Sequence, residues 1–135
     1  MRRFFIEEHP SDLLISAEGE NFCDLVLGIM EGVLSSVIDS RKGCRRKEER
    51  IKVSFTDREE LFISLLNELI FLLYYRHYIP LSCQYEMRED EATFIFSGLK
   101  CQKIKFSLEI KSATYHDLLL DLQGEKKAAK VLFDV

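Results

Sequence analysis

The sequence predicts an α+β fold in which two helices pack on a mostly antiparallel, meandering β-sheet. Two long stretches repeat apolar residues at helical spacing, and several shorter stretches alternate apolar with polar residues. The strand-like stretches follow one another with short polar turns between them, which favours antiparallel pairing and a layer of helices on a sheet. A length of 135 residues with only six glycines and two prolines fits a single domain over 1–135.

The first helix is expected to begin at Asn21, because an asparagine side chain can accept hydrogen bonds from the amides of a first helical turn. Its apolar positions follow helical spacing: Leu25, Val26, Ile29, Met30, Val33, Leu34, Val37 and Ile38. The second helix is expected from about 58 to 75, after a capping box at 56–59. It is apolar nearly all round, so we expect it to be the central buried helix.

Strands are expected where apolar and polar residues alternate or where short apolar runs lie between turn residues. These stretches are 4–6, 13–18, 51–55, 78–86, 92–96 and 131–135. The stretch 104–122 forms either two strands or one long bent strand. A polar turn over 7–12 is expected to join the first two strands.

Composition and charge exclude some classes of protein. The chain is 47% hydrophobic and 31% charged, which is sufficient for a core and excludes a disordered chain. A net charge of −4 disfavours tight, direct nucleic-acid binding. One basic run departs from this: Arg41, Lys42, Arg45, Arg46, Lys47 and Arg50. It is interpreted as a solvated loop, with contact to an RNA substrate or an acidic partner as the alternative.

The four cysteines show none of the close spacing of a zinc or redox motif. Cys23, Cys83 and Cys101 lie among apolar residues and are expected to be small side chains in or near the core. The start of the chain lacks the apolar region of a signal peptide, and Asn67 and Glu68 interrupt the longest apolar helix. A cytoplasmic location without membrane contact is expected.

Asp12 and Asp134 are the residues most suggestive of chemistry. Asp12 ends a polar turn, and Asp134 interrupts an apolar final strand. A buried carboxylate needs a cation or hydrogen-bond donors, and Val135 adds a main-chain oxygen beside Asp134. Such oxygens suit Ca²⁺, Mg²⁺ or Mn²⁺ rather than Zn²⁺. The alternative is that Asp12 is an ordinary turn residue and Asp134 a frayed terminal one.

No glycine-rich phosphate loop and no hydrolase motif is present. His9 and His116 could serve hydrolysis with nearby carboxylates, but no nucleophile and base are visible together. A lone strand histidine such as His116 is more often structural. Asn67 and Glu68 form either the solvent edge of the second helix or part of a functional groove.

Four segments together resemble the archease family. They are Glu8-His9-Pro10-Ser11-Asp12, the helical segment 65–72 around Asn67-Glu68, the strand segment 109–116 from Glu109 to His116, and the ending Phe133-Asp134-Val135. The resemblance extends over nearly the whole chain. The segment 98–105 departs from the family pattern, and Asp12 is followed by Leu13-Leu14 rather than by the family's usual Val or Ile and Gly.

The resemblance implies a function that composition and spacing do not show. Archeases are non-catalytic activators of the RtcB-type RNA ligase of tRNA splicing and RNA repair. They promote guanylylation of the ligase by GTP and its repeated turnover. The family's divalent cation, typically calcium, would be bound here by Asp12, Asp134 and Val135. His9, Asn67, Glu68 and His116 are weaker candidates for contact with the ligase, and contact with tRNA would be indirect. The altered 98–105 segment motivates an alternative, a protein-interaction or chaperone-like module without a ligase partner.

Overall fold

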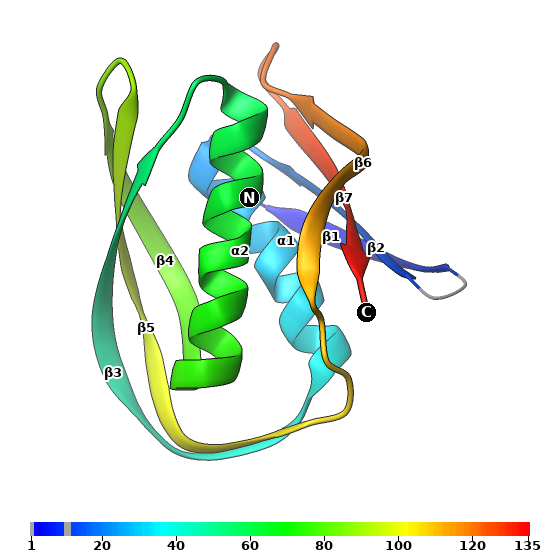
Figure 1. Cartoon of the computed structure of the whole chain (residues 1–135), viewed down its shortest axis with the longest axis vertical. Helices are drawn as coiled ribbons and strands as arrows, with labels where there is room; N and C mark the ends of the chain where they lie inside the picture. Colours follow the sequence, from blue (N-terminus) through cyan, green and yellow to red (C-terminus); the bar gives the residue numbers. More distant parts are fainter. Residues whose placement is uncertain (1, 10–11) are drawn as a thin grey trace. The chain divides into compact units, whose positions relative to one another are not determined.

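The computed structural model describes residues 2–9 and 12–135 and confirms the α+β class. Two helices and seven strands follow one another along the chain (Figure 1). In chain order they are β1 (Arg3–His9), β2 (Asp12–Gly19), α1 (Phe22–Val37), β3 (Ile38–Ser54), α2 (Arg58–Arg76), β4 (Tyr78–Met87), β5 (Glu91–Phe106), β6 (Ser112–Asp121) and β7 (Lys127–Asp134). Among the described residues, no helix is long and apolar enough to cross a membrane.

The strands form two sheets rather than the one meandering sheet that was expected. The chain divides into a first unit, Met1–Ile38 with Phe106–Val135, and a second unit, Asp39–Lys105. The first unit has the strand order β1-β2-β7-β6 and contains α1, whereas the second has the order β3-β5-β4 and contains α2. Alternation along a strand predicts which face is buried but not which strand pairs with which, so the division was not visible in the sequence.

In the first unit, α1 packs on one face of the sheet. Leu13, Ile15 and Ala17 alternate along β2 and are buried, as is Phe133 on β7. Gly28 lies against this face, because a Cβ atom built there would be 2.9 Å from the Cβ of Ala17. Glycine therefore lets α1 approach β2 closely.

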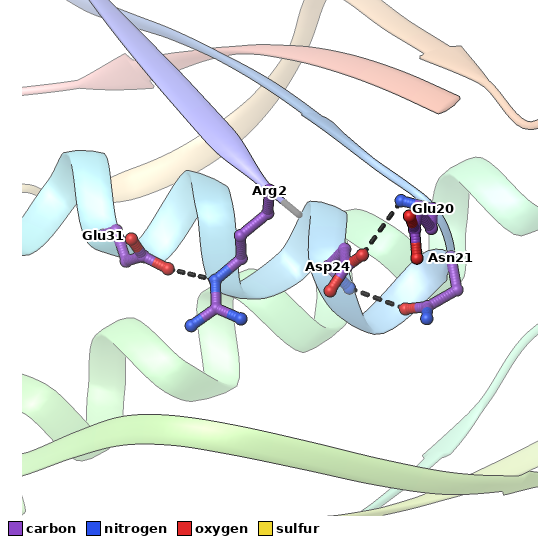
Figure 2. A network of polar contacts seen from close by, with 5 residues as sticks. All are labelled: Arg2, Glu20, Asn21, Asp24 and Glu31. Carbon is purple, nitrogen blue, oxygen red and sulfur yellow. Dashed lines mark hydrogen bonds and ion pairs between the residues drawn. The ribbon is translucent and has the colours of Figure 1, made fainter. Parts of the chain in front are cut away.

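The start of α1 is capped as predicted. The Asn21 side chain accepts a hydrogen bond from the amide of Asp24 at 2.9 Å, and the Asp24 carboxylate accepts one from the amide of Glu20, also at 2.9 Å (Figure 2). An ion pair between Arg2 and Glu31 links the residue before β1 to the middle of α1 (Figure 2). The cap satisfies an amide that the first helical turn leaves without an intrahelical partner.

The second unit is built around α2, β4 and β5. Phe62, Phe94, Phe96 and Tyr78 are fully buried. Helix α2 is less completely buried than its composition indicated, because Phe71 and Tyr75 are exposed. These two aromatic rings are four positions apart and stack on each other, with 4.9 Å between their centroids.

Helix α2 begins at Arg58, as predicted, but its cap is one residue later than the capping box indicated. Asp57 is the N-cap, and its side chain accepts a hydrogen bond from the amide of Glu60 at 2.8 Å. The Glu60 carboxylate in turn accepts the amide of Thr56 at 2.8 Å. In a capping box the side chain at N3 accepts a hydrogen bond from the amide of the N-cap itself, whereas Glu60 accepts one from Thr56, the residue before the cap, so the motif is only partly present.

Two predicted boundaries were wrong, at the basic run and at the expected turn over 7–12, because strand pairing extends further than expected, and the structure settles the stretch 104–122 that was left open. The basic run is not a loop but part of β3, which follows α1 without a turn. The expected turn over 7–12 is mostly strand, since Glu7, Glu8 and His9 belong to β1 and Asp12 begins β2, whereas Pro10 and Ser11 lie outside the described residues. The stretch 104–122 comprises the end of β5, a short connection and β6.

The structure contains a disulfide that the sequence did not predict. Cys101 is buried, as expected, but it is bonded to Cys44 on the neighbouring strand β3. The two residues are 57 positions apart in the sequence, so only the pairing of β3 with β5 reveals their proximity. Cys23 is buried and Cys83 is half-buried, in keeping with their apolar sequence neighbours.

Tyr78 is expected to ionise only at strongly alkaline pH. Burial, helped by the carboxylates of Glu49 and Glu48, raises the pKa of Tyr78 from 10.0 to about 12. Its hydroxyl donates a hydrogen bond of 2.9 Å to the carbonyl of Lys47. Because the raised pKa belongs to the folded state, the stabilisation is complete below pH 10 and is lost as the pH rises through 12. In a spectroscopic titration of phenolate absorbance, Tyr78→Phe should remove a step near pH 12, and an unchanged curve would contradict this assignment.

Candidate functional site

A row of polar residues crosses one end of the first sheet. Antiparallel pairing places Asp12 directly opposite Asp134, His9 opposite Asp12, and Ser112 opposite Asp134. Residues directly opposite each other in an antiparallel pair share a face, with Cβ atoms about 4.5–5.5 Å apart. The structure therefore brings together the two aspartates that are almost the whole chain apart in sequence, and Figure 1 shows β7 beside β2.

The register that produces this row is fixed by the core. Residues Asp12–Gly19 pair with Lys127–Asp134 without interruption. Leu13 faces Phe133 and Ile15 faces Val131, and all four are buried. A slip of one residue would move these side chains to the other face of the sheet. The position of the two aspartates thus follows from the burial of their neighbours.

The main chain around Asp134 is held from both sides. On one side β2 pairs with β7, and on the other the amide of Lys111 donates a hydrogen bond of 2.8 Å to the carbonyl of Asp134. Asp134 is therefore not frayed, and Asp12 is a strand residue rather than a turn residue, which corrects the alternative interpretation of both. Sequence reasoning did not single out Lys111, although the segment 109–116 that contains it was recognised as a motif.

Two acidic residues lie opposite each other in this row. Asp12 is half-buried and Asp134 exposed, and the next pair on the same face is Leu14 with Leu132, both buried. Like charges directly opposite each other destabilise a strand pair, and apolar neighbours reduce the water available to hydrate them. A cation shared by the two carboxylates would remove that cost.

The opposite end of β2 shows how the same sheet neutralises an acid with its own side chains. The carboxylate of Glu18 lies 2.7 Å from the Nζ atom of Lys126 and 3.3 Å from the guanidinium of Arg3. The hydrogen bond from Lys126 is the main cause of a lowered pKa for Glu18, to which Arg3 also contributes. At that end of the strand the sheet itself supplies the two cations that neutralise the acid.

The residues present fit a hard divalent cation. Two carboxylates and a main-chain oxygen of Val135 are ligands that calcium, magnesium and manganese accept. In the part of the chain that the structure describes, no group of three or more His, Cys, Asp or Glu side chains could hold a metal ion. The candidate site is accordingly the aspartate pair with main-chain oxygen, completed by water or by a partner, rather than a closed protein cage.

Of the other residues named from the sequence, His9 pairs through its backbone with Asp12. His116 lies in an irregular part of β6, where Asp117 has a φ of 53°, and its Nε2 atom is 3.4 Å from the Asp117 carboxylate. Both side chains are more than 70% exposed. Asn67 and Glu68 belong to α2 in the second unit, where Glu68 is exposed and Asn67 half-buried.

Comparison with known proteins gives a consistent result. Residues 4–135 match the sequence model of the archease protein family (MTH1598/TM1083). The chain is 25% identical to protein archease of Methanosarcina mazei, covering 95% of this chain and 92% of that protein, and 24% identical to protein archease of Sulfurisphaera tokodaii over the whole of both.

Two solved structures share the fold. The solution structure of protein 1598 of Methanobacterium thermoautotrophicum has a TM-score of 0.70 at 17% identity and covers 99% of this chain and 98% of its own. The crystal structure of an archease from Thermotoga maritima, described as a possible chaperone, has a TM-score of 0.65 at 21% identity, with coverage of 96% and 94%. Because the family match extends over nearly the whole sequence, the chain belongs to the archease protein family.

Proposed function

We propose that this archease is a non-catalytic activator of an RtcB-type RNA ligase in tRNA splicing or RNA repair. It would promote the GTP-dependent guanylylation of the ligase and so permit multiple turnover. The observation that carries the proposal is the direct pairing of Asp12 with Asp134 in a chain of this family. Calcium is the expected cation, with magnesium and manganese as alternatives.

The chain's own contribution would be a rigid, negatively charged end of a sheet. Asp12 and Asp134 stand on paired strands rather than on loops, so their spacing is set before any partner binds. A bound divalent cation would supply positive charge at a place where two carboxylates would otherwise repel nucleotide phosphates. Asp134 is exposed, which leaves this end of the sheet open to a partner protein.

A ligation time course tests this function. With RNA in excess over the cognate ligase, the wild-type protein should raise product beyond one equivalent per ligase. Asp12→Asn and Asp134→Asn should each leave the ligase near a single turnover, because one carboxylate cannot hold the cation as a pair does. Glu125→Gln, an exposed change in the same unit, is the matched control and should retain full stimulation. Failure of the wild-type protein to stimulate would refute the proposal.

A chaperone-like role is the second candidate, because the Thermotoga relative is described as a possible chaperone. It predicts that the protein suppresses the aggregation of a heated client enzyme, as measured by light scattering, with Asp134→Asn as effective as the wild type. Recovery of an RNA ligase as the main partner from native lysate would argue against this alternative. Suppression that depended on Asp134 would also count against it.

A further inference from the structure

The basic run of the sequence forms an exposed strand surface in the second unit. Arg41, Lys42, Arg45, Arg46, Lys47 and Arg50 all belong to β3, and all six are exposed. Strand β3 lies at the edge of its sheet, with β5 as its neighbour. We propose that this segment, 41–50, called the basic strand below, binds the phosphate backbone of a double-helical RNA.

The basic strand keeps a net positive charge, because its six Lys or Arg residues outnumber its two acidic residues, Glu48 and Glu49. Between Arg41 and Lys47 there is no acidic residue, and β3 as a whole carries seven Lys or Arg and three Asp or Glu in a chain whose net charge is −4. Within the described residues, none of the six basic side chains forms an ion pair. By contrast, Lys105 on β5 is paired with Asp39, and Lys52 with Glu91. The field of the basic strand is therefore available to an external anion.

The geometry of the strand suits an extended anion. At about 3.3 Å per residue, the ten positions from Arg41 to Arg50 span roughly 30 Å. One turn of a DNA double helix is about 34–36 Å long, and an A-form RNA helix has a somewhat shorter rise per base pair, so the strand is roughly as long as one helical turn. The disulfide between Cys44 and Cys101 and the hydrogen bond from Tyr78 to the Lys47 carbonyl hold β3 on its neighbours. The charges are thus presented on a fixed scaffold rather than on a loop.

The residue types indicate that the basic strand binds an oxyanion rather than only protecting an edge. Charged residues on an edge strand can serve simply to prevent edge-to-edge aggregation, and lysine is the residue most often used for that purpose. Here four of the six are arginines. The planar guanidinium binds phosphate oxygens in a bidentate manner and is less strongly hydrated than an ammonium group. The guanidinium binds carboxylates in the same way, so the arginines indicate an oxyanion ligand, and it is the length of the row, roughly 30 Å, that favours the continuous phosphates of a nucleic acid.

The same strands indicate a double helix rather than a single strand. Single-stranded nucleic acid is usually bound by aromatic side chains on which bases stack. Neither β3 (38–54) nor the adjoining part of β5 (99–105) contains an aromatic residue. Because it has basic side chains but no aromatic ones, this surface can contact the sugar-phosphate backbone of a helix but has no ring on which an unstacked base could stack.

The test measures binding of the purified protein to a fluorescent RNA hairpin by anisotropy over a range of salt concentrations, without any ligase. Each phosphate contact contributes about −0.9 to the slope of log K against log salt for a double helix. The triple variant Arg41→Gln/Arg45→Gln/Arg46→Gln should weaken binding about tenfold or more at low salt and reduce the magnitude of the slope by about 3. Lys126→Gln/Lys127→Gln/Lys130→Gln, which removes the same charge from the first unit, should leave both quantities nearly unchanged.

Four results would overturn the proposal: no measurable binding of the hairpin by the wild-type protein, equal losses in the two triple variants, tighter binding of a single strand of the same length, or tighter binding of polyglutamate than of the hairpin. The last result would assign the basic strand to an acidic protein partner. All three substituted arginines are exposed, so a normal circular dichroism spectrum is expected and confirms that the variant is folded. Since no ligase is present, the outcome is independent of the function proposed above.

Discussion

Replacing Gly98 with alanine is expected to destabilise the protein by at least about 3 kcal/mol, near the upper end of overpacking effects. A Cβ atom built at Gly98 would lie 2.1 Å from the carbonyl oxygen of Ile79 and 2.9 Å from the hydroxyl of Tyr78. The first contact is with backbone, so no side-chain rotation can relieve it. Gly98 stands on β5, the middle strand of its sheet, opposite Pro80 and next to a register shift in β4. Strands β4 and β5 would have to separate to accept even one methyl group.

Denaturant unfolding of the variant provides the measurement, and Gly124→Ala is the control. Gly124 has a φ of 76°, but a Cβ atom there meets nothing within 4 Å. Its replacement should therefore cost only the strain of a left-handed backbone, about 1–2 kcal/mol. If Gly98→Ala were no more damaging than this control, the close approach of β4 to β5 would be wrong.

The helices were predictable because the information that specifies them is local. The spacing of apolar residues and the cap at Asn21 lie within a few positions of each other, and the structure confirms α1 almost to the residue. Helix α2 begins where it was expected, and only its cap differs, because Asp57 rather than Thr56 fills that position. That was a choice between adjacent residues that both cap helices well.

The pairing of strands was not predictable, because its determinants lie far apart in the sequence. The basic run has the composition of a loop, yet its main chain pairs with β5 and so becomes strand. The same pairing places Cys44 against Cys101. Neither residue carries a local signal of this contact, since alternation and charge describe one strand at a time.

The candidate site was predictable only in part. The polar breaks at Asp12 and Asp134 were visible in the sequence, and the resemblance of the segments around them to one family made their proximity an expectation. The structure adds the direct pairing of the two residues and the contact of Lys111 with the Asp134 carbonyl. Those contacts depend on the order β2-β7-β6, which no local pattern reveals.

Exchanging Asp134 for asparagine is expected to change stability in opposite directions with and without calcium. In a chelator the wild type carries two like charges directly opposite each other on β2 and β7, which costs about 0.2–1 kcal/mol. The asparagine side chain carries no charge, so Asp134→Asn should be slightly more stable than the wild type under these conditions. The difference in stability between the wild type and Asp134→Asn in chelator therefore measures the repulsion between the two carboxylates.

With calcium at about 100 times its dissociation constant, a site present only in the folded state stabilises the protein by about 2.7 kcal/mol. The wild type should gain this amount, which corresponds to a rise in Tm of roughly 10 °C for a domain of this size. Asp134→Asn should gain little, so the order of stability reverses. Asp12→Asn should behave in the same way, and Glu125→Gln should follow the wild type in both conditions.

Thermal unfolding with calcium, magnesium, manganese or chelator measures both halves of this prediction. If no divalent cation changed the Tm of the wild type, the proposal of a metal site would be rejected, whatever the effect of the substitution in chelator. A loss of stability in chelator on Asp134→Asn would instead mean that the carboxylate accepts a structural hydrogen bond that asparagine cannot replace. The effect of Asp134→Asn on stability is expected to change sign only if the two carboxylates repel each other without a cation and share a cation when calcium is present. Neither repulsion nor hydrogen bonding alone depends on calcium.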